Sequence, residues 1–178
     1  MELDGKPLVR HAVDAAIDAG LAEIVVVLGH EADRVLEALG ELPTICRTVI
    51  NPRFGDGQSS SLAVGLQTAS EESQAAVVLL ADQPGVSAAT VGALVRAFLA
   101  GRSRIVRVHY RDGPGPALLS REIWPEATHL RGDTGARVLI ASHPDWVELV
   151  EVDDDAPIDV DTAEDAERLA QNAGPSRR

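Results

Sequence analysis

The sequence predicts an α/β fold in which a mostly parallel sheet is covered by helices on both faces. Two continuous apolar runs of strand length, Glu23–Leu28 and Ala75–Leu80, are typical of strands that are buried on both faces. Segments with helical spacing of apolar residues alternate with the strands, and the clearest of them follows the N-cap Ser87. Because alternating strands and helices form βαβ units, we expect most neighbouring strands to be parallel.

The first half of the chain supplies helices on either side of the run Glu23–Leu28. A helix begins at Pro7, a residue favoured in the first turn, and ends at Gly20. A short helix follows from about Glu31 to Leu39, and 44–50 is the next predicted strand. Another helix begins at Ser59, which gives the alternating order that a covered sheet requires.

The second half adds a hairpin and a last strand. Arg104–His109 and Ala117–Leu119 flank the turn-forming residues 111–115, which are typical of a hairpin loop. Two short helices are expected before the strand at Trp146–Val152. A final helix begins at Thr162, where Thr and a following Asp resemble a capping box.

Composition favours one domain of a cytoplasmic protein. A chain of 178 residues with 45% hydrophobic residues is long enough for a sizeable core. No linker divides it, so we expect a single domain over residues 1–171 and a disordered tail over residues 172–178. No apolar run reaches the length of a membrane span and no signal peptide is visible, so we expect no membrane partner. The net charge of −12 argues against a nucleic acid as partner.

A segment rich in glycine and serine follows the predicted strand at 44–50. Open α/β sheets bind ligands beyond the carboxyl ends of their strands, where this segment lies. Gly57 allows close approach of the backbone, and Ser59, Ser60 and Ser61 open a helix whose amino end favours negative charge. The alternative is a flexible turn followed by an ordinary serine N-cap.

Two acidic segments follow at other strand ends. Asp82 comes just after Ala75–Leu80, where a carboxylate is well placed to hold a hard divalent cation against phosphate oxygens. The alternative is that Asp82 starts a turn before Pro84. Asp159 and Asp161 alternate as on a strand and so share one side of the chain. The alternative here is a solvated loop with Asp161 beside a helix N-terminus.

Six short motifs occur in an order that resembles the MobA-like NTP transferase family, over about residues 5–169. They are GKPL, VVVLGH, NP…GQSSSLAVGL, LLADQP, RGDTGAR and DVDTAED. By pattern the sequence is most similar to the molybdenum cofactor cytidylyltransferases. The resemblance implies a three-layer, Rossmann-like nucleotidyltransferase fold that moves CMP from CTP onto the phosphate of a molybdopterin-type cofactor and releases pyrophosphate. The alternatives are a sugar- or lipid-phosphate acceptor, and a non-catalytic or truncated remnant of the fold.

The resemblance also implies roles for individual residues. Asp82 and Asp161 match the family's Mg²⁺ ligands and are therefore the candidate catalytic pair. Gly57 and Ser59–Ser61, together with Asp82, match the residues that bind the nucleotide. The residues that match a motif near the acceptor are Asp133, Thr134 and Arg137. A molybdoenzyme and a second copy of the chain are the candidate protein partners.

The sequence departs from the family pattern at two places. It has Gly115-Pro116-Ala117 where family members usually show Gly-His-Pro. The family also opens with a strand and a loop of the form LAAG…RMG…K that cradles the triphosphate, whereas this sequence begins just after that loop. We therefore expect a sheet that lacks the family's first strand beside Glu23–Leu28. Residues 1–178 alone are expected to bind CTP weakly or not at all, and to aggregate or dimerise through the open edge.

Overall fold

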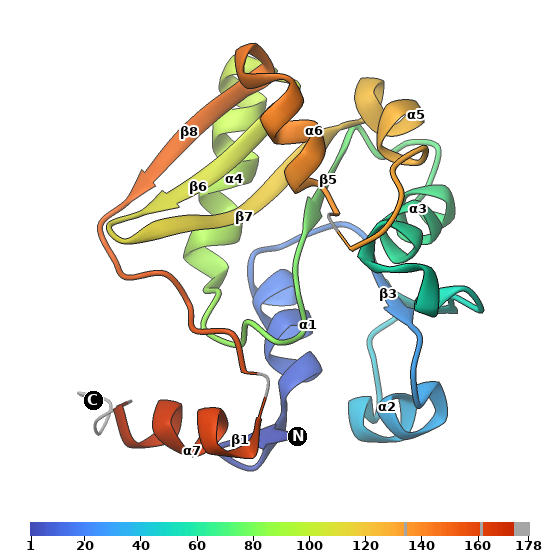
Figure 1. Cartoon of the computed structure of the whole chain (residues 1–178), viewed down its shortest axis with the longest axis vertical. Helices are drawn as coiled ribbons and strands as arrows, with labels where there is room; N and C mark the ends of the chain where they lie inside the picture. Colours follow the sequence, from blue (N-terminus) through green and yellow to red (C-terminus); the bar gives the residue numbers. More distant parts are fainter. Residues whose placement is uncertain (134, 161, 173–178) are drawn as a thin grey trace.

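Three layers of secondary structure make up the described part of the chain, residues 1–133, 135–160 and 162–172 of a computed structural model (Figure 1). The α-helices are α1 (Leu8–Asp18), α2 (Ala32–Leu39), α3 (Gln58–Thr68), α4 (Ala88–Gly101), α5 (Trp124–Ala127), α6 (Arg137–Ser142) and α7 (Ala163–Asn172). The strands are β1 (Glu2–Leu3), β2 (Lys6–Pro7), β3 (Ile24–Leu28), β4 (Cys46–Ile50), β5 (Ala75–Val78), β6 (Ile105–Tyr110), β7 (Gly113–Ser120) and β8 (Val147–Val152). Apart from Asn172, the last residue of α7, the predicted tail lies outside the described residues.

The strands form two main sheets and a short β1–β2 hairpin. One sheet pairs β3 with β4 in parallel, and the other has the order β5-β7-β6-β8. Strand β7 is antiparallel to β5 and β6, whereas β6 and β8 are parallel. The α/β class is confirmed, but the directions are more mixed than the predicted mostly parallel sheet. The reason is the tight turn at residues 111–112, which sends β7 back between β5 and β6.

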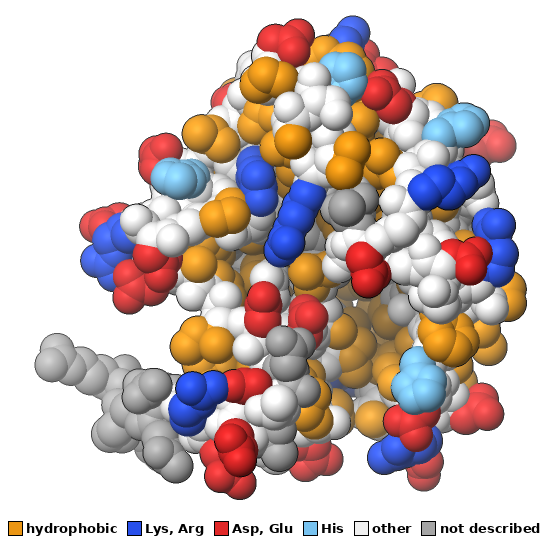
Figure 2. All heavy atoms as spheres, in the orientation of Figure 1, with side chains coloured by type: hydrophobic (Ala, Val, Ile, Leu, Met, Phe, Trp, Pro, Cys, Tyr) orange, Lys and Arg blue, Asp and Glu red, His pale blue; other side chains and the backbone are white. Residues whose placement is uncertain are grey.

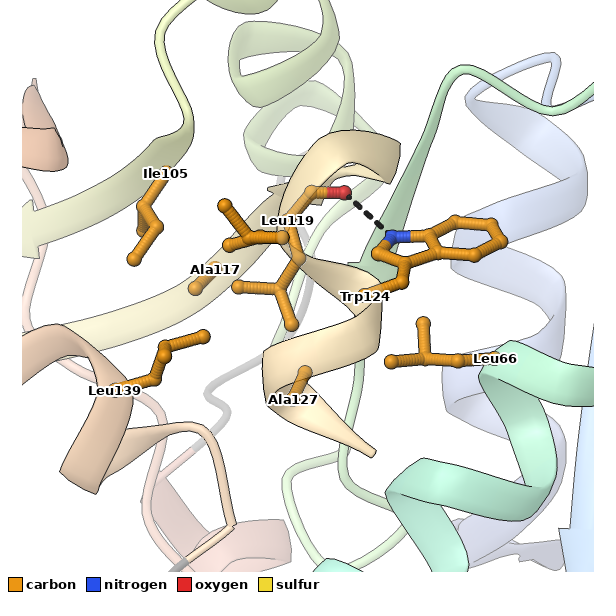
Figure 3. Packing of buried hydrophobic residues seen from close by; sticks show 8 residues of the cluster. Leu66, Ile105, Ala117, Leu119, Trp124, Ala127 and Leu139 are labelled. Atoms are coloured by element: carbon orange, nitrogen blue, oxygen red, sulfur yellow. Dashed lines mark hydrogen bonds between the residues drawn. The ribbon is translucent and has the colours of Figure 1, made fainter. Parts of the chain in front are cut away.

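Helices cover both faces of these sheets. On one face α1 and α2 pack against β3, and α4 packs against β6 and β7, with α1 and α4 in contact. On the other face, α3, α5 and α6 surround an apolar cluster in which the indole nitrogen of Trp124 donates a hydrogen bond to the carbonyl oxygen of Leu119, at 3.2 Å (Figure 3). Among the described helices, none combines the length and the apolar character needed to cross a bilayer.

The sheets are interrupted between β3 and β5. Within the described residues these strands belong to different sheets, and a cavity of about 710 Å³ lies between them. Apolar side chains of β3, β5, α1, α3 and α4 line it, and Figure 2 shows that a hollow opens on this face of the molecule. The predicted gap beside β3 is confirmed. The predicted full burial of Ala75–Leu80 is wrong, since all of Ala75–Val78 is only half-buried along the cavity.

Glu23 ties the two sheets together at the start of β3. Its carboxylate accepts hydrogen bonds from the backbone N–H of Ser70, at 2.8 Å, and from the hydroxyl of Ser73, at 3.3 Å, and it pairs with Arg47. Arg121 donates from the other side to the carbonyl oxygens of Ser70 and Ser73, at 2.7 and 2.9 Å. The loop before β5 is therefore fixed to β3 although the two strands are not paired.

The Glu23 contacts predict how stability depends on pH. Burial raises the pKa of Glu23, but the hydrogen bond from Ser70, the Arg47 ion pair and the bond from Ser73 outweigh it and lower the pKa below its usual 4.5. A carboxylate with a lowered folded pKa stabilises the fold above its unfolded pKa and loses this effect as the pH falls. We expect the Glu23→Gln variant to lose about 1–3 kcal/mol of unfolding free energy at neutral pH. Urea denaturation measures the loss.

The same variant has a second, pH-dependent signature. The unfolding free energy of the unmodified chain is expected to fall between about pH 5 and pH 3, and that of Glu23→Gln to fall less. The exposed Glu71 provides the matched control, Glu71→Gln, which is expected to behave like the unmodified chain. Identical pH dependence in all three proteins would show that Glu23 does not link the sheets.

Candidate functional site

The loop between β4 and α3 is organised by Asn51, whose side chain is fully buried. Its amide nitrogen Nδ2 lies 2.8 Å from the Ser60 hydroxyl and 3.0 Å from the Ser61 hydroxyl. Its Oδ1 accepts the backbone N–H of Arg53, at 2.9 Å, and its own N–H donates to the Leu28 carbonyl oxygen at the end of β3, at 2.7 Å. Asn51 therefore fixes the glycine- and serine-rich loop to the carboxyl ends of both β3 and β4.

The three serines differ in how accessible their side chains are to a ligand. The Ser60 hydroxyl lies 2.9 Å from the Arg53 carbonyl oxygen and 2.8 Å from that of Gly57, so its hydrogen bonds are made within the loop. Ser59 is 2% exposed. Ser61 is half-buried and lines the cavity between β3 and β5. Of the three predicted nucleotide-binding serines, Ser61 has the clearest access to a ligand in that cavity.

Gly57 brings this loop against the segment that precedes α6. Its φ of +100° is in the region that favours glycine, and a Cβ there would lie 2.4 Å from the carbonyl carbon of Gly132. The backbone N–H of Gln58 donates to the Asp133 carboxylate and that of Ser59 to the Gly132 carbonyl oxygen, both at 3.1 Å. The predicted nucleotide segment and the predicted acceptor segment are therefore interlocked.

The predicted acceptor residues have different positions. Asp133 accepts from the first N–H of α3, which leaves that helix one fewer unsatisfied donor. Arg137 is exposed and begins α6. Thr134 lies outside the described residues. One carboxylate oxygen of Asp133 is therefore used to join the two segments.

Gly57 predicts a large effect of a small substitution. A methyl group at this position is strained by the positive φ and collides with the Gly132 backbone, so we expect Gly57→Ala to lower the unfolding free energy by about 1–3 kcal/mol. Gly55→Ala is the matched control, because a Cβ at Gly55 meets nothing within 4 Å. Urea denaturation compares the two variants. Equal losses would contradict the close packing of the two segments.

The two acidic segments also lie side by side. The backbone N–H of Val160 donates to the Asp82 carbonyl oxygen, at 2.8 Å, and the Gln83 side chain donates to Asp159, at 2.7 Å. Asp82 is half-buried, and one oxygen of its carboxylate is shielded from solvent. Asp161, the residue after Val160, lies outside the described residues. The structure thus joins the segments that contain the two predicted metal ligands.

The chemistry of these segments fits a hard divalent cation. Carboxylate oxygens are preferred ligands of Mg²⁺, which is usually held by one or two of them together with phosphate oxygens and water. Within the described ranges, no three His, Cys, Asp or Glu side chains come close enough to hold a metal ion by themselves.

Comparison with known proteins gives the family. Residues 1–147 match the MobA-like NTP transferase domain. Nicotine blue oxidoreductase of Paenarthrobacter nicotinovorans is 32% identical over 173 residues, which cover 93% of this chain and 83% of that protein. The Rv0371c protein of Mycobacterium tuberculosis H37Rv, solved in complex with manganese, is 28% identical to this chain, with a TM-score of 0.82. The matched region covers 97% of this chain and 90% of the Rv0371c chain. An Rv0371c homologue from Mycobacterium sp. strain JC1 is 32% identical, with a TM-score of 0.83, over 97% of this chain and 85% of the homologue. The chain belongs to the MobA-like NTP transferase family.

Proposed function

We propose that this chain transfers CMP from CTP onto the terminal phosphate of a molybdopterin-type cofactor and releases pyrophosphate. Membership of a nucleotidyltransferase family supports the reaction class. The observation that carries the proposal is the interlocking of the Gly57 loop with the Asp133 segment. It places the candidate nucleotide residues next to the candidate acceptor residues, as a transfer between two bound substrates requires.

The proposed reaction needs no nucleophile from the protein. The acceptor phosphate is anionic at neutral pH, and one of its oxygens attacks the α-phosphorus of the nucleotide. A new P–O–P bond forms as the bond from the α-phosphorus to the bridging oxygen breaks and pyrophosphate leaves. The task of the protein is to position the two phosphates and to offset their charge. Ser61 and the backbone of the Gly57 loop are the groups that we assign to the nucleotide.

We assign a divalent cation, Mg²⁺ by preference, to Asp82 and Asp161. The shielded carboxylate oxygen of Asp82 and the link from Val160 to Asp82 support this assignment. The manganese complex of Rv0371c is a further support. When bound, such a cation polarises phosphate oxygens and offsets negative charge. Asp82 and Asp161 serve in this proposal to hold it next to the nucleotide.

Pyrophosphate release tests the proposal with a matrix of substrates. CTP, GTP, UTP and ATP are each paired with molybdopterin, a sugar phosphate and a lipid phosphate. We expect release that depends on both substrates and is fastest for CTP with molybdopterin. A faster reaction with another nucleotide or acceptor would overturn the assigned specificity, but nucleotidyl transfer would remain the reaction class. If folded protein releases no pyrophosphate with any pair, the proposed transfer reaction is wrong for this chain.

The relationship to nicotine blue oxidoreductase supports a second candidate activity, an oxidoreductase reaction. The same protein preparation is incubated with nicotine blue, with and without a reductant, and the absorbance of the dye is followed. Consumption that is faster than without protein, with no pyrophosphate release in the first assay, would favour this second activity. We expect no consumption.

We also propose a cytoplasmic location. The single cysteine, Cys46, is half-buried against the apolar residues of β3, and burial raises the pKa of its thiol. A reduced thiol of this kind is typical of a reducing compartment. Fractionation of cells that make the protein tests the location.

A further inference from the structure

Two arginines without an acidic partner lie where β6 meets α6. Neither Arg107, in β6, nor Arg137, at the start of α6, makes an ion pair with a described residue. The Nε of Arg107 is buried and has no hydrogen-bond partner among the described residues. Ile105, two residues before Arg107 on the same face of β6, packs in one cluster with Leu139 of α6, so this part of β6 lies against α6. Burial lowers the pKa of Arg107, and the positive charge of Arg137 lowers it further.

Among the arginines that the structure describes, Arg107 is distinguished by a buried side-chain nitrogen without a hydrogen-bond partner. Six other arginines pair with carboxylates, namely Arg10, Arg34, Arg47, Arg104, Arg111 and Arg168, whereas the salt bridges of the described residues do not include Arg53, Arg96, Arg102 or Arg121. Arg137 is exposed, whereas partial burial and the charge of Arg137 both disfavour the charged form of Arg107. A bound anion between them would remove both costs.

The sheet register places Arg107 level with the carboxyl end of β5, the strand that precedes Asp82. Arg107 pairs with Ala117 of β7, and Ala117 pairs with Val78, the last residue of β5. Paired residues share a face, and Ala117 belongs to the cluster covered by α5 and α6. Since β5 and β6 are both antiparallel to β7, they run in the same direction. Arg107 therefore lies on the α6 side, level with the end of the strand that Asp82 follows.

Burial along β6 shows that Arg107 marks the border of the apolar core. On this face Ile105 is fully buried, Arg107 is half-buried and His109 is exposed. Figure 2 shows basic side chains over the end of α6 nearest the hollow, with acidic side chains gathered below them. Arg107 thus lies between the buried core and the exposed end of this face of β6.

We infer that Arg107 and Arg137 together bind the phosphate group of the acceptor and position it for attack. This inference rests on the proposed transfer reaction. A guanidinium group matches two phosphate oxygens with parallel N–H donors, and two such groups suit one dianionic phosphate monoester. The sequence motif indicated Arg137, whereas Arg107 emerges only from the fold. The pair selects acceptors that end in a phosphate monoester, whatever group carries that phosphate.

Phosphorus NMR titration with inorganic phosphate tests the site on the full chain. The dissociation constant for phosphate is compared among the unmodified chain, Arg107→Gln, Arg137→Gln and the matched control Arg96→Gln. Arg96 is an exposed arginine of α4, on the opposite face. Loss of a charge-assisted pair of hydrogen bonds corresponds to about a tenfold or greater rise in the dissociation constant. We expect this rise in both site variants and none in Arg96→Gln. Equal affinity in all four proteins would overturn the inference.

Two further measurements separate binding from folding and from the proposed reaction. Phosphate is expected to raise the thermal midpoint of the unmodified chain and not that of Arg107→Gln, whose midpoint without phosphate is unchanged or higher. In the transfer assay, Arg107→Gln is expected to raise the KM for the phosphorylated acceptor and not the KM for CTP. A raised KM for CTP instead would assign the arginines to the nucleotide and overturn the inference. If phosphate binding follows the arginines but the unmodified chain transfers nothing, the proposed function fails and the anion site stands.

Discussion

Replacing Asp82 by asparagine is expected to reduce nucleotidyl transfer by a factor of about 10² to 10³ or more. The substitution removes the charge that would hold the cation while keeping the size of the side chain. Its effect on folding is expected to be small, because the hydrogen bond from Val160 is made to the Asp82 backbone carbonyl. Initial rates of pyrophosphate release measure the effect, and circular dichroism checks the fold.

Asp159→Asn provides the matched control for that variant. Asp159 lies in the neighbouring acidic segment, and an asparagine there still accepts the hydrogen bond from Gln83. We expect it to retain most of the transfer rate. If Asp82→Asn keeps the transfer rate within a factor of ten, Asp82 has no place in the mechanism. Equal losses in the two variants would show that the loss of one negative charge in this region, and not of a specific metal ligand, lowers the rate.

The interrupted sheet is expected to produce very unequal hydrogen exchange within one strand. The N–H of Ile24 bonds to the Ile45 carbonyl oxygen, so by alternation Val26 and Leu28 also point to β4. The backbone groups of Val25 and Val27 point to the cavity, where the described residues include no neighbouring strand. We expect the amides of Val25 and Val27 to exchange at least about 100-fold faster than those of Val26 and Leu28.

Residue-resolved exchange by NMR measures this alternation. Val106 and Val108 of β6, which has a partner strand on each side, serve as internal standards for slow exchange. Light scattering in the same buffer shows whether the chain self-associates through the open edge. Slow exchange at Val25 and Val27 in a monomer would contradict an open gap beside β3. Slow exchange only in a dimer would show that a second copy fills it.

Local patterns in the sequence were sufficient for most of the fold. The apolar run that contains β3 needs no distant information, because hydrophobic residues of strand length between two helices already define a covered strand. The N-cap of α4 is confirmed, since the Ser87 hydroxyl accepts the N–H of Thr90 at 3.1 Å. The hairpin of β6 and β7 was also recognised, with β6 shifted by one residue, but β7 is longer than expected. Pairing extends nearly to the turn, where few side-chain signals mark a boundary.

The features that sequence reasoning missed depend on contacts between distant segments. The packing of Gly57 against Gly132 joins residues far apart in the chain, and no local pattern encodes it. Asn51 was seen only as part of a polar loop, although an asparagine directly after a strand was a signal for a buried, hydrogen-bonded role. Arg107 was missed because a basic residue in a strand is usually solvated. Its lack of an acidic partner becomes visible only when α6 is placed beside β6.

Isotope tracing tests the central claim, nucleotidyl transfer at this site, most directly. The chain is incubated with molybdopterin and CTP that carries ³²P either at the α- or at the γ-phosphate. We expect the α-label to move to the acceptor and the γ-label to appear in pyrophosphate, and Asp82→Asn to slow both by a factor of about 10² or more. An α-label that remains in CTP, or appears only in free CMP while the acceptor stays unlabelled, would contradict the claim.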